Sequence, residues 1–232
     1  MAKVNALFGK ATGKVGAIVF QVNGGVQIMK EKAAKVSNPQ TDAQVEQRAK
    51  FKLLSQVAAA VSPAIAIPKK GTVSARNQFV SKNIGLAEYS NDTAQMLLDN
   101  LQLTNGSQSI PAPTATEGQG NTASVALSSP VVGQLDKVVY ASIEKTTDEK
   151  LRVVEILSVD ADAQGTFAGT IKTGDADTFI YAYGVKFTDA NQRARFENYY
   201  ASRGDNSAML GVEIGQVLAG AILTETQSAH LE

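Results

Sequence analysis

Residues 178–187 read TFIYAYGVKF, and this stretch decides the fold of the second half of the chain. Every second position holds an aromatic or branched residue, namely Phe179, Tyr181, Tyr183, Val185 and Phe187. A period of two is typical of a β-strand, because successive side chains point to opposite faces of the sheet. The stretch therefore predicts a half-buried strand with an aromatic inner face.

Further short apolar runs, separated by turn residues, flank this stretch on both sides. They predict strands near residues 123–128, 137–144, 151–159, 166–172 and 195–201. About six short strands in about 80 residues are typical of an immunoglobulin-like or fibronectin-like β-sandwich. The chain has no Cys and no Trp, so the prediction depends on strand spacing and not on the Cys–Trp–Cys pattern of antibody domains.

The N-terminal segment VGAIVFQVNGGVQIMKEK, residues 15–32, predicts a β-hairpin. Asn23-Gly24 is a preferred pair for a two-residue turn, because both central positions need a positive φ. That turn would place Val19 opposite Ile28 and Ile18 opposite Met29, which makes both faces partly apolar. A lone hairpin is marginal in water, so we expect this one to pack on something.

A helix is expected from Asp42 to Val61. Thr41 and Gln44 have the spacing of a capping box, in which each side chain bonds the backbone N–H of the other residue. Glu46 and Lys50 can pair one turn apart. Apolar residues recur along one stripe, formed by Val45, Ala49, Leu53, Val57 and Val61 and widened by Leu54 and Ala58.

Residues 105–122 are rich in Gly, Ser, Pro and Thr and are interpreted as a linker. The fold class expected is mainly β with a helical N-terminal part. The predicted organisation is a basic hairpin-helix module (1–104), the linker (105–122), the sandwich (123–202), a C-terminal arm (203–230) and a tag remnant (231–232). The apolar tail could instead add a strand or a helix to the fold.

Charge is distributed unevenly along a chain whose net charge is zero. Residues 1–85 hold 13 Lys and Arg against 3 acids, and residues 86–232 hold 9 against 19. This asymmetry favours either a polyanionic partner or head-to-tail contact between copies. The residues expected to meet such a partner are Lys10, Lys14, Lys30, Lys32, Lys35, Arg48, Lys52, Lys69 and Lys70. A solvated basic face is the alternative, and the nearby rings, Phe51 among them, are expected mostly in the core.

Several classes of chemistry are excluded by composition. Without Cys, the chain has no disulfide, thiolate metal site or Cys nucleophile, and its single His is His230. A Ser-His-Asp triad and a His-ligated metal site do not suit a chain with one terminal His. We therefore expect no enzyme, no catalytic residue, no metal and no cofactor.

The two motifs that suggest ligand loops fail on detail. GKATGKVG, residues 9–16, is one residue too short for a phosphate-binding P-loop, has Val15 where Ser or Thr is needed, and precedes a predicted strand. DADAQG, residues 160–165, begins like a calcium loop but has Ile171 where Glu would be required. Both DADAQG and GDAD (174–177) are interpreted as acidic turns.

No run of 18 apolar residues occurs, so no membrane span is expected. The first ten residues lack the pattern of a signal peptide. We therefore expect the protein to be made and to reside in a cytoplasm, or to be delivered by a route other than secretion.

Three motifs support a resemblance to a known family. They are the loop with Gly9, Gly13-Lys14 and Gly16, the segment with Asn38-Pro39, Thr41, Gln44 or Gln47, Arg48 and Lys50-Phe51, and the later stretches NQFVSKN and YAYGVKFTDANQRARFENYYAS. The chain resembles, over residues 3–202, an uncharacterised domain-of-unknown-function family of Bacteroidota and their phages and prophages. The resemblance implies a phage or prophage setting, with the cytoplasm of the host cell during synthesis and the virion as expected locations. It implies no catalytic residues.

The leading hypothesis is therefore a non-enzymatic phage structural or virion-associated protein that acts through contacts with itself or with other virion proteins. The first alternative is a nucleic-acid-binding protein that uses the basic N-terminal half. The second is a module that binds glycans or surfaces through the sandwich loops.

Overall fold

The computed structural model describes residues 2–3, 12–23, 25–32, 40–128, 135–201 and 214–231. The chain forms two compact units, residues 1–42 and residues 43–232. Each unit is described separately below.

The first unit contains one antiparallel sheet of four strands in the order β1-β4-β3-β2. Its strands are β1 (Ala2–Lys3), β2 (Gly13–Val15), β3 (Ile18–Asn23) and β4 (Val26–Glu31). The predicted hairpin is present, but its turn lies one residue later than expected, because Asn23 pairs with Val26. Gly25, with φ of 83°, takes the conformation that the turn requires. Each residue of β3 therefore has a partner two positions further along β4, and the side chains keep their faces.

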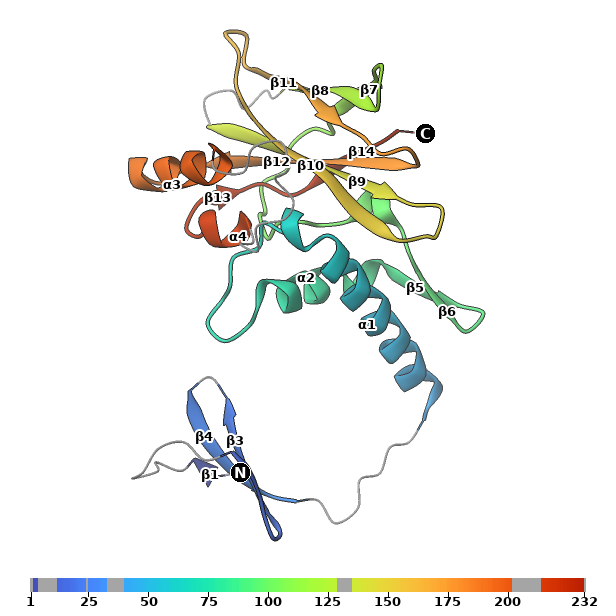
Figure 1. Ribbon diagram of the computed structural model, residues 1–232, viewed down its shortest axis with the longest axis vertical. Coiled ribbons are helices and arrows are strands. Elements are labelled where there is room, and N and C mark those ends of the chain that lie inside the picture. Colours follow the sequence, from blue (N-terminus) through green and yellow to red (C-terminus); the bar gives the residue numbers. More distant parts are fainter. Residues whose placement is uncertain are drawn as a thin grey trace. The chain divides into compact units, whose positions relative to one another are not determined.

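The second unit is built on a β-sandwich, as the strand spacing predicts (Figure 1). One sheet contains β10 (Leu151–Asp160), β9 (Lys137–Lys145), β12 (Thr178–Lys186), β13 (Ile222–Leu223) and β14 (Gln227–Leu231). The other contains β11 (Thr166–Lys172), β8 (Thr122–Ser128) and β7 (Thr114–Glu117). In the smaller sheet β8 pairs with β11, and in the larger sheet β9 pairs with β12. Immunoglobulin-type sandwiches have the same pairing.

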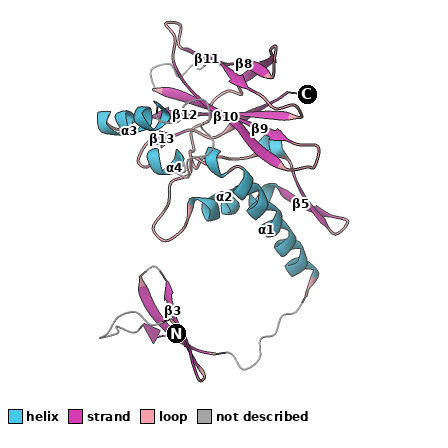
Figure 2. Ribbon diagram, in the orientation of Figure 1, coloured by secondary structure: helices cyan, strands magenta, loops and turns pink. Residues whose placement is uncertain are grey.

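Two helices cover the outer face of the larger sheet: α1 (Asp42–Ala60) and α2 (Ala75–Asn83) (Figure 2). Strand β12 therefore lies in a middle layer. Tyr181 and Tyr183 point into the helix-side core, whereas Ile180 and Ala182 point into the core between the sheets. The prediction that this strand is half-buried is wrong, because a second layer covers the face that alternation alone would leave to solvent.

Helix α1 begins where expected, at Asp42, and the Glu46–Lys50 pair forms at 2.6 Å. Burial is confined to its C-terminal half, where Leu54 and Ala58 are fully buried. Val45, at the start of the apolar stripe, is 38% exposed. The reciprocal half of the capping box is missing, because Gln44 Oε1 has no hydrogen-bond partner among the described residues.

Residues 86–104, which the sequence leaves ambiguous between helix and strand, contain a small hairpin. Its strands are β5 (Ala87–Ser90) and β6 (Thr93–Met96), and both residues of the turn, Asn91 and Asp92, have positive φ. Two short 3₁₀ turns flank this hairpin, η2 (Ile84–Leu86) and η3 (Leu98–Asn100), and a third, η1 (Ser62–Ala64), follows α1.

Residues 195–201 form no strand, contrary to the prediction, and belong to helix α3 (Ala190–Ala201). Asp189 starts this helix, since its Oδ1 accepts a hydrogen bond from the N–H of Gln192 at 2.8 Å. Gln192 and Phe196, one turn apart, are both buried. The Asp-x-x-Gln spacing at residues 189–192 is a helix-start signal, and it outweighs the strand-like composition of the residues that follow.

The structure divides the chain at a different place from the predicted linker. Residues 105–122 lie inside the second unit, contain β7, and bury Ile110 to 5% exposure. The described part of the predicted C-terminal arm also belongs to the sandwich, where it forms α4 (Ile214–Val217) and the edge strands β13 and β14. Leu231, interpreted as part of a tag remnant, pairs with Thr178.

Candidate interaction surfaces

The predicted basic site is distributed over both units. Lys14, Lys30 and Lys32 are exposed in the first unit, and Arg48, Lys52, Lys69 and Lys70 are exposed in the second. Lys10 and Lys35 lie outside the described residues. The second unit thus presents a separate group of basic residues of its own.

One face of the first-unit sheet is basic. Val19 pairs with Lys14 on one side and with Lys30 on the other, so these three side chains form a row across three strands. Lys30 Nζ donates to Gln21 Oε1 at 3.2 Å on the same face. The row leaves two ammonium groups exposed on either side of one valine.

The opposite face of that sheet is mainly apolar, with Gln27 and Glu31 as its polar members, and we call it the apolar sheet face. It is formed by Val15, Ile18, Phe20, Val22 and Met29. Val15 is 69% exposed and Ile18 is 40% exposed. A hollow of about 340 Å³ beside Ile18 and Met29 opens on the unit's surface. Large apolar side chains at such exposure are the part of this unit that is least suited to water.

In the second unit, one side of α1 lies next to the first turn of α2. Arg48, Phe51, Lys52 and Ser55 have the spacing i, i+3, i+4 and i+7, which places them on the same side of the helix. Arg76 Nη2, in the first turn of α2, donates to the backbone oxygen of Ser55 at 2.5 Å. This contact brings a further cation beside the α1 face.

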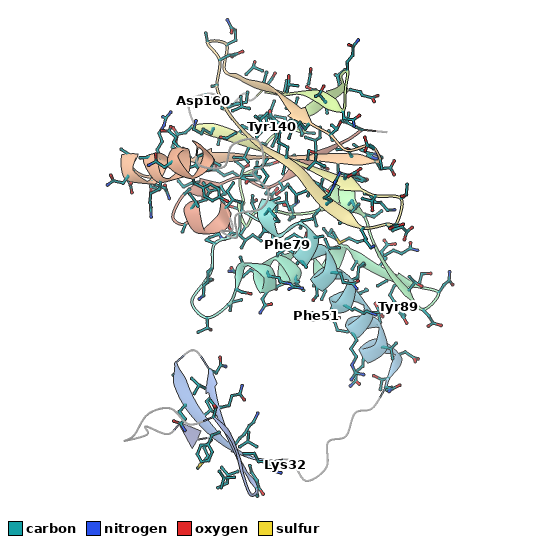
Figure 3. All side chains as sticks on the ribbon, viewed as in Figure 1. Lys32, Phe51, Phe79, Tyr89, Tyr140 and Asp160 are labelled. Carbon is teal, nitrogen blue, oxygen red and sulfur yellow. The ribbon has the colours of Figure 1, made fainter. Side chains whose placement is uncertain are left out.

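Phe51 is the aromatic residue of this face, and it is 52% exposed (Figure 3). The loop that leads into α2 carries Lys69 and Lys70, which are both exposed. We use the name α1–α2 basic surface for the set Arg48, Phe51, Lys52, Lys69, Lys70 and Arg76. Most of the nearby rings are expected in the core, and Phe51 is an exception, because the N-terminal half of α1 has no apolar layer against this side among the described residues.

Elsewhere in the second unit, several cations are paired. Lys137 Nζ lies 2.8 Å from Asp160, and Arg193 Nε lies 2.8 Å from Glu197. The hydrogen bond that Arg193 donates to Glu197 raises the pKa of Arg193 further above its ordinary value. By contrast, the described residues place no carboxylate within 4.0 Å of Lys52, Lys69, Lys70 or Arg76. Among the described residues, the positive charge of these four cations is therefore not neutralised by an ion pair.

The buried charged groups hold the sandwich together. Glu144 is 3% exposed, and its carboxylate accepts hydrogen bonds from Arg152 and from the backbone N–H groups of Asp175 and Ala176. Lys137, at the other end of β9, is 7% exposed and pairs with Asp160. Both groups join neighbouring strands or turns, which is a structural role.

The motifs that resembled ligand loops form turns and strands. Asp162 Oδ1 accepts hydrogen bonds from the N–H groups of Gln164 (2.9 Å) and Thr166 (2.7 Å), so its carboxylate stabilises an acidic turn as predicted. Gly13–Val15 is strand β2, and Gly16 (φ 57°) begins the turn to β3. Within the described ranges, no group of three or more His, Cys, Asp or Glu is arranged to hold a metal ion.

An apolar groove of about 590 Å³ lies on another side of α1. It is lined by Leu53 and Val57 of α1 and by Leu151 beside the β9–β10 turn, with Glu149 and Lys150 at its rim. Nothing in the sequence pattern indicates this groove, because its two walls are almost a hundred positions apart in the chain.

The prediction that the chain has no membrane span can be compared with its helices. No helix in the described part of the chain is both long enough and apolar enough to span a bilayer.

Comparison with known proteins gives one match. Residues 10–83 match DUF6266, described as a family of unknown function. The match covers less than half of the chain and ends at the last residue of α2, so the sandwich lies outside it. Neither the curated proteins nor the solved structures contain a significant match to the chain. Over residues 10–83 the chain is thus similar to an uncharacterised domain family, as the N-terminal motifs suggested.

Proposed function

We propose that this protein is a non-enzymatic assembly protein of the phage structural or virion-associated kind, which acts through contacts with other copies or with other particle proteins. The observation that carries the proposal is the apolar sheet face of the first unit. Val15 and Ile18 stand on it at 69% and 40% exposure.

A single sheet is stable when one face is covered by a second layer. The described residues of the first unit ahead of α1 form the sheet, its turns and a few flanking positions, so they supply no such layer. Burial of apolar surface contributes about 25 cal/mol per Å². A partner that covers this face therefore both stabilises the unit and gains affinity from it.

The distribution of charge supports contact between copies. The basic row of Lys14 and Lys30 lies on the face opposite the apolar one, and the chain from residue 86 onward has ten more acids than bases. Opposite charges on two parts of one chain steer copies into head-to-tail contact and favour a particular register. Head-to-tail contacts build rings or filaments, which are the assemblies that structural proteins form.

The phage setting rests on the family resemblance of the N-terminal motifs, and the match of residues 10–83 to a family of unknown function is compatible with it. A role without catalysis suits a molecule whose buried carboxylate and ammonium groups, Glu144 and Lys137, are engaged in holding strands together. Mass spectrometry of purified virions, or the identity of the neighbouring genes, tests the setting directly.

Light scattering on the full chain over a concentration series tests the assembly role. Ile18→Lys places a charge on the apolar sheet face, opposite Glu31, where the sheet itself tolerates a cation. We expect the wild type to form oligomers and Ile18→Lys to weaken association by about tenfold or more. Val26→Lys is the matched control, because Val26 is 42% exposed on the other face of the same sheet.

Val26→Lys should assemble as the wild type does. A wild type that stays monomeric at high concentration and binds no particle protein would overturn the proposal. The same conclusion follows if Ile18→Lys and Val26→Lys associate equally well.

A further inference from the structure

We infer that the α1–α2 basic surface of the second unit binds single-stranded nucleic acid, with a base stacked on Phe51 and the phosphates held by the surrounding cations. This inference goes beyond the assembly role and does not depend on it. The apolar sheet face and the α1–α2 basic surface belong to different units and are tested by different variants.

The geometry places Phe51 beside the cations of its own helix and brings Arg76 of α2 against the same helix. Phe51 is followed at once by Lys52, and Arg48 precedes it by three positions on the same side of α1. The hydrogen bond from Arg76 to the backbone oxygen of Ser55 holds the first turn of α2 against α1. Ser55 lies one helical turn beyond Phe51. Lys69 and Lys70 lie in the loop that leads into α2, close to Arg76 along the chain.

The charge on this part of the chain is strongly one-signed. Residues 43–86 contain seven Lys and Arg and a single acid, Glu46, which is paired with Lys50 at 2.6 Å. The carboxylates that neutralise Lys137 and Arg193 have no counterpart beside Lys52, Lys69, Lys70 or Arg76 among the described residues. A surface of this kind attracts a polyanion and releases its counterions, which makes the binding dependent on salt.

The exposed ring of Phe51 favours one class of polyanion over the others. A Phe that is 52% exposed costs free energy in water, and here it lies among cations instead of at an apolar patch. Unpaired bases offer flat faces that stack on such a ring, whereas the bases of a duplex are already stacked on each other. An acidic protein segment would neutralise the lysines but would leave the ring without a planar partner. The combination of ring and cations therefore favours a single strand.

Fluorescence anisotropy with a labelled oligothymidylate, titrated with the full chain at a series of salt concentrations, tests the inference. We expect saturable binding that weakens steeply as salt rises. Phe51→Ala should weaken binding by about fivefold or more, since stacking on one ring contributes about 1–3 kcal/mol. Phe51→Tyr, which keeps a ring, should bind within about twofold of the wild type.

The cation variants have a different signature. Lys52→Gln combined with Lys70→Gln should lower the slope of log K against log salt by about 0.7 for each charge removed. Lys186→Gln, at an exposed cation of β12, and Leu97→Ala, at a side chain that is 56% exposed, are the matched controls. Both controls should bind like the wild type. Because Phe51, Lys52 and Lys70 are exposed, thermal melting should confirm that these variants remain folded.

Three results would overturn the inference. The first is no binding at about 50 mM salt, where electrostatic contacts are strong. The second is equal binding by Phe51→Ala and the wild type, which would reduce the surface to a non-specific basic face. The third is a polyglutamate peptide or a duplex that binds as tightly as the single strand and with the same response to Phe51→Ala, which would assign the surface to another class of partner.

Discussion

The carboxylate of Glu144 lies against the guanidinium of Arg152, with Oε2 3.1 Å from Nε and 2.7 Å from Nη2. Its other oxygen accepts the backbone N–H groups of Asp175 and Ala176, at 3.0 and 3.2 Å. One buried side chain thereby joins β9 to β10 and to the turn between β11 and β12. GDAD (174–177) lies in this turn, where the sequence predicts an acidic turn.

Glu144→Ala should destabilise the protein by about 2 kcal/mol, because it removes a buried carboxylate that accepts hydrogen bonds from Arg152 and from two backbone N–H groups. Arg152 is 62% exposed in its side chain and can be solvated, so the loss is smaller than for a fully buried pair. Urea unfolding measures the change. Asp148→Ala is the control, because Asp148 pairs with Lys150 at 3.7 Å with both side chains more than three-quarters exposed. It should change stability by less than about 0.5 kcal/mol.

Gly106→Ala tests whether the Gly- and Ser-rich segment 105–122 is packed or is a free linker. An added Cβ at Gly106 would lie 2.2 Å from the backbone oxygen of Leu223 and 2.3 Å from that of Thr224. The backbone must move, and we expect a loss of at least about 2 kcal/mol. Gly85→Ala, where an added Cβ meets nothing within 4 Å, should be close to neutral. Equal melting temperatures for the two variants would contradict the packed arrangement.

Two buried tyrosines should respond oppositely to removal of their hydroxyl groups. Tyr183 OH has no hydrogen-bond partner among the described residues, whereas Tyr140 OH donates to the backbone oxygen of Phe167 at 2.6 Å. Tyr183→Phe removes an unsatisfied polar group and should stabilise the protein by about 1 kcal/mol. Tyr140→Phe removes a made hydrogen bond and should destabilise it by about the same amount. Urea unfolding of the two variants at pH 7 gives the comparison.

Stability should fall as the pH rises above about 10. Burial raises the pKa values of Tyr140, Tyr181 and Tyr183 well above the ordinary value of a phenol. The unfolded chain loses these protons near pH 10 while the folded chain keeps them. The unfolded state then binds fewer protons, so the stability from the neutral phenols is complete below pH 10 and is lost above it. Tyr183→Phe should make the decline less steep, and an unchanged slope would contradict this account.

Leu54→Ala and Val45→Ala should show that α1 is anchored by its C-terminal half alone. Leu54 is fully buried, and its truncation leaves a cavity that costs about 2–5 kcal/mol. Val45 is 38% exposed, although it lies on the same predicted apolar stripe, and its truncation should cost less than about 0.5 kcal/mol. Thermal melting of both variants makes the test, and similar losses would show that the whole stripe is covered.

The strands of the sandwich were predictable because their signal is local. Alternation within 178–187 and turn residues between the apolar runs place β8 to β12 within a residue or two of where the structure has them. Helix α3 was predicted as a strand, although its start signal, Asp189 with Gln192, is local too. Residues 195–201 have a strand-like composition, but the cap that precedes them starts a helix that continues through them.

The candidate surfaces were only partly predictable. The excess of cations before residue 86 is a property of composition and needs no structure to find. The exposure of Phe51 and the approach of Arg76 to Ser55 depend on how α1 docks, and a helical stripe does not show where along its length the core ends.

By itself, the sequence determined the β-rich class, the positions of the sandwich strands, the first helix and the charge split, because each follows from neighbours along the chain. The tertiary structure alone decided that both faces of β12 are buried, that residues 105–122 and the described tail complete the second unit, and that Phe51 faces solvent among cations. The physical reason is that burial depends on which distant segment covers a face, and periodicity reports the shape of an element but not the layer that packs on it.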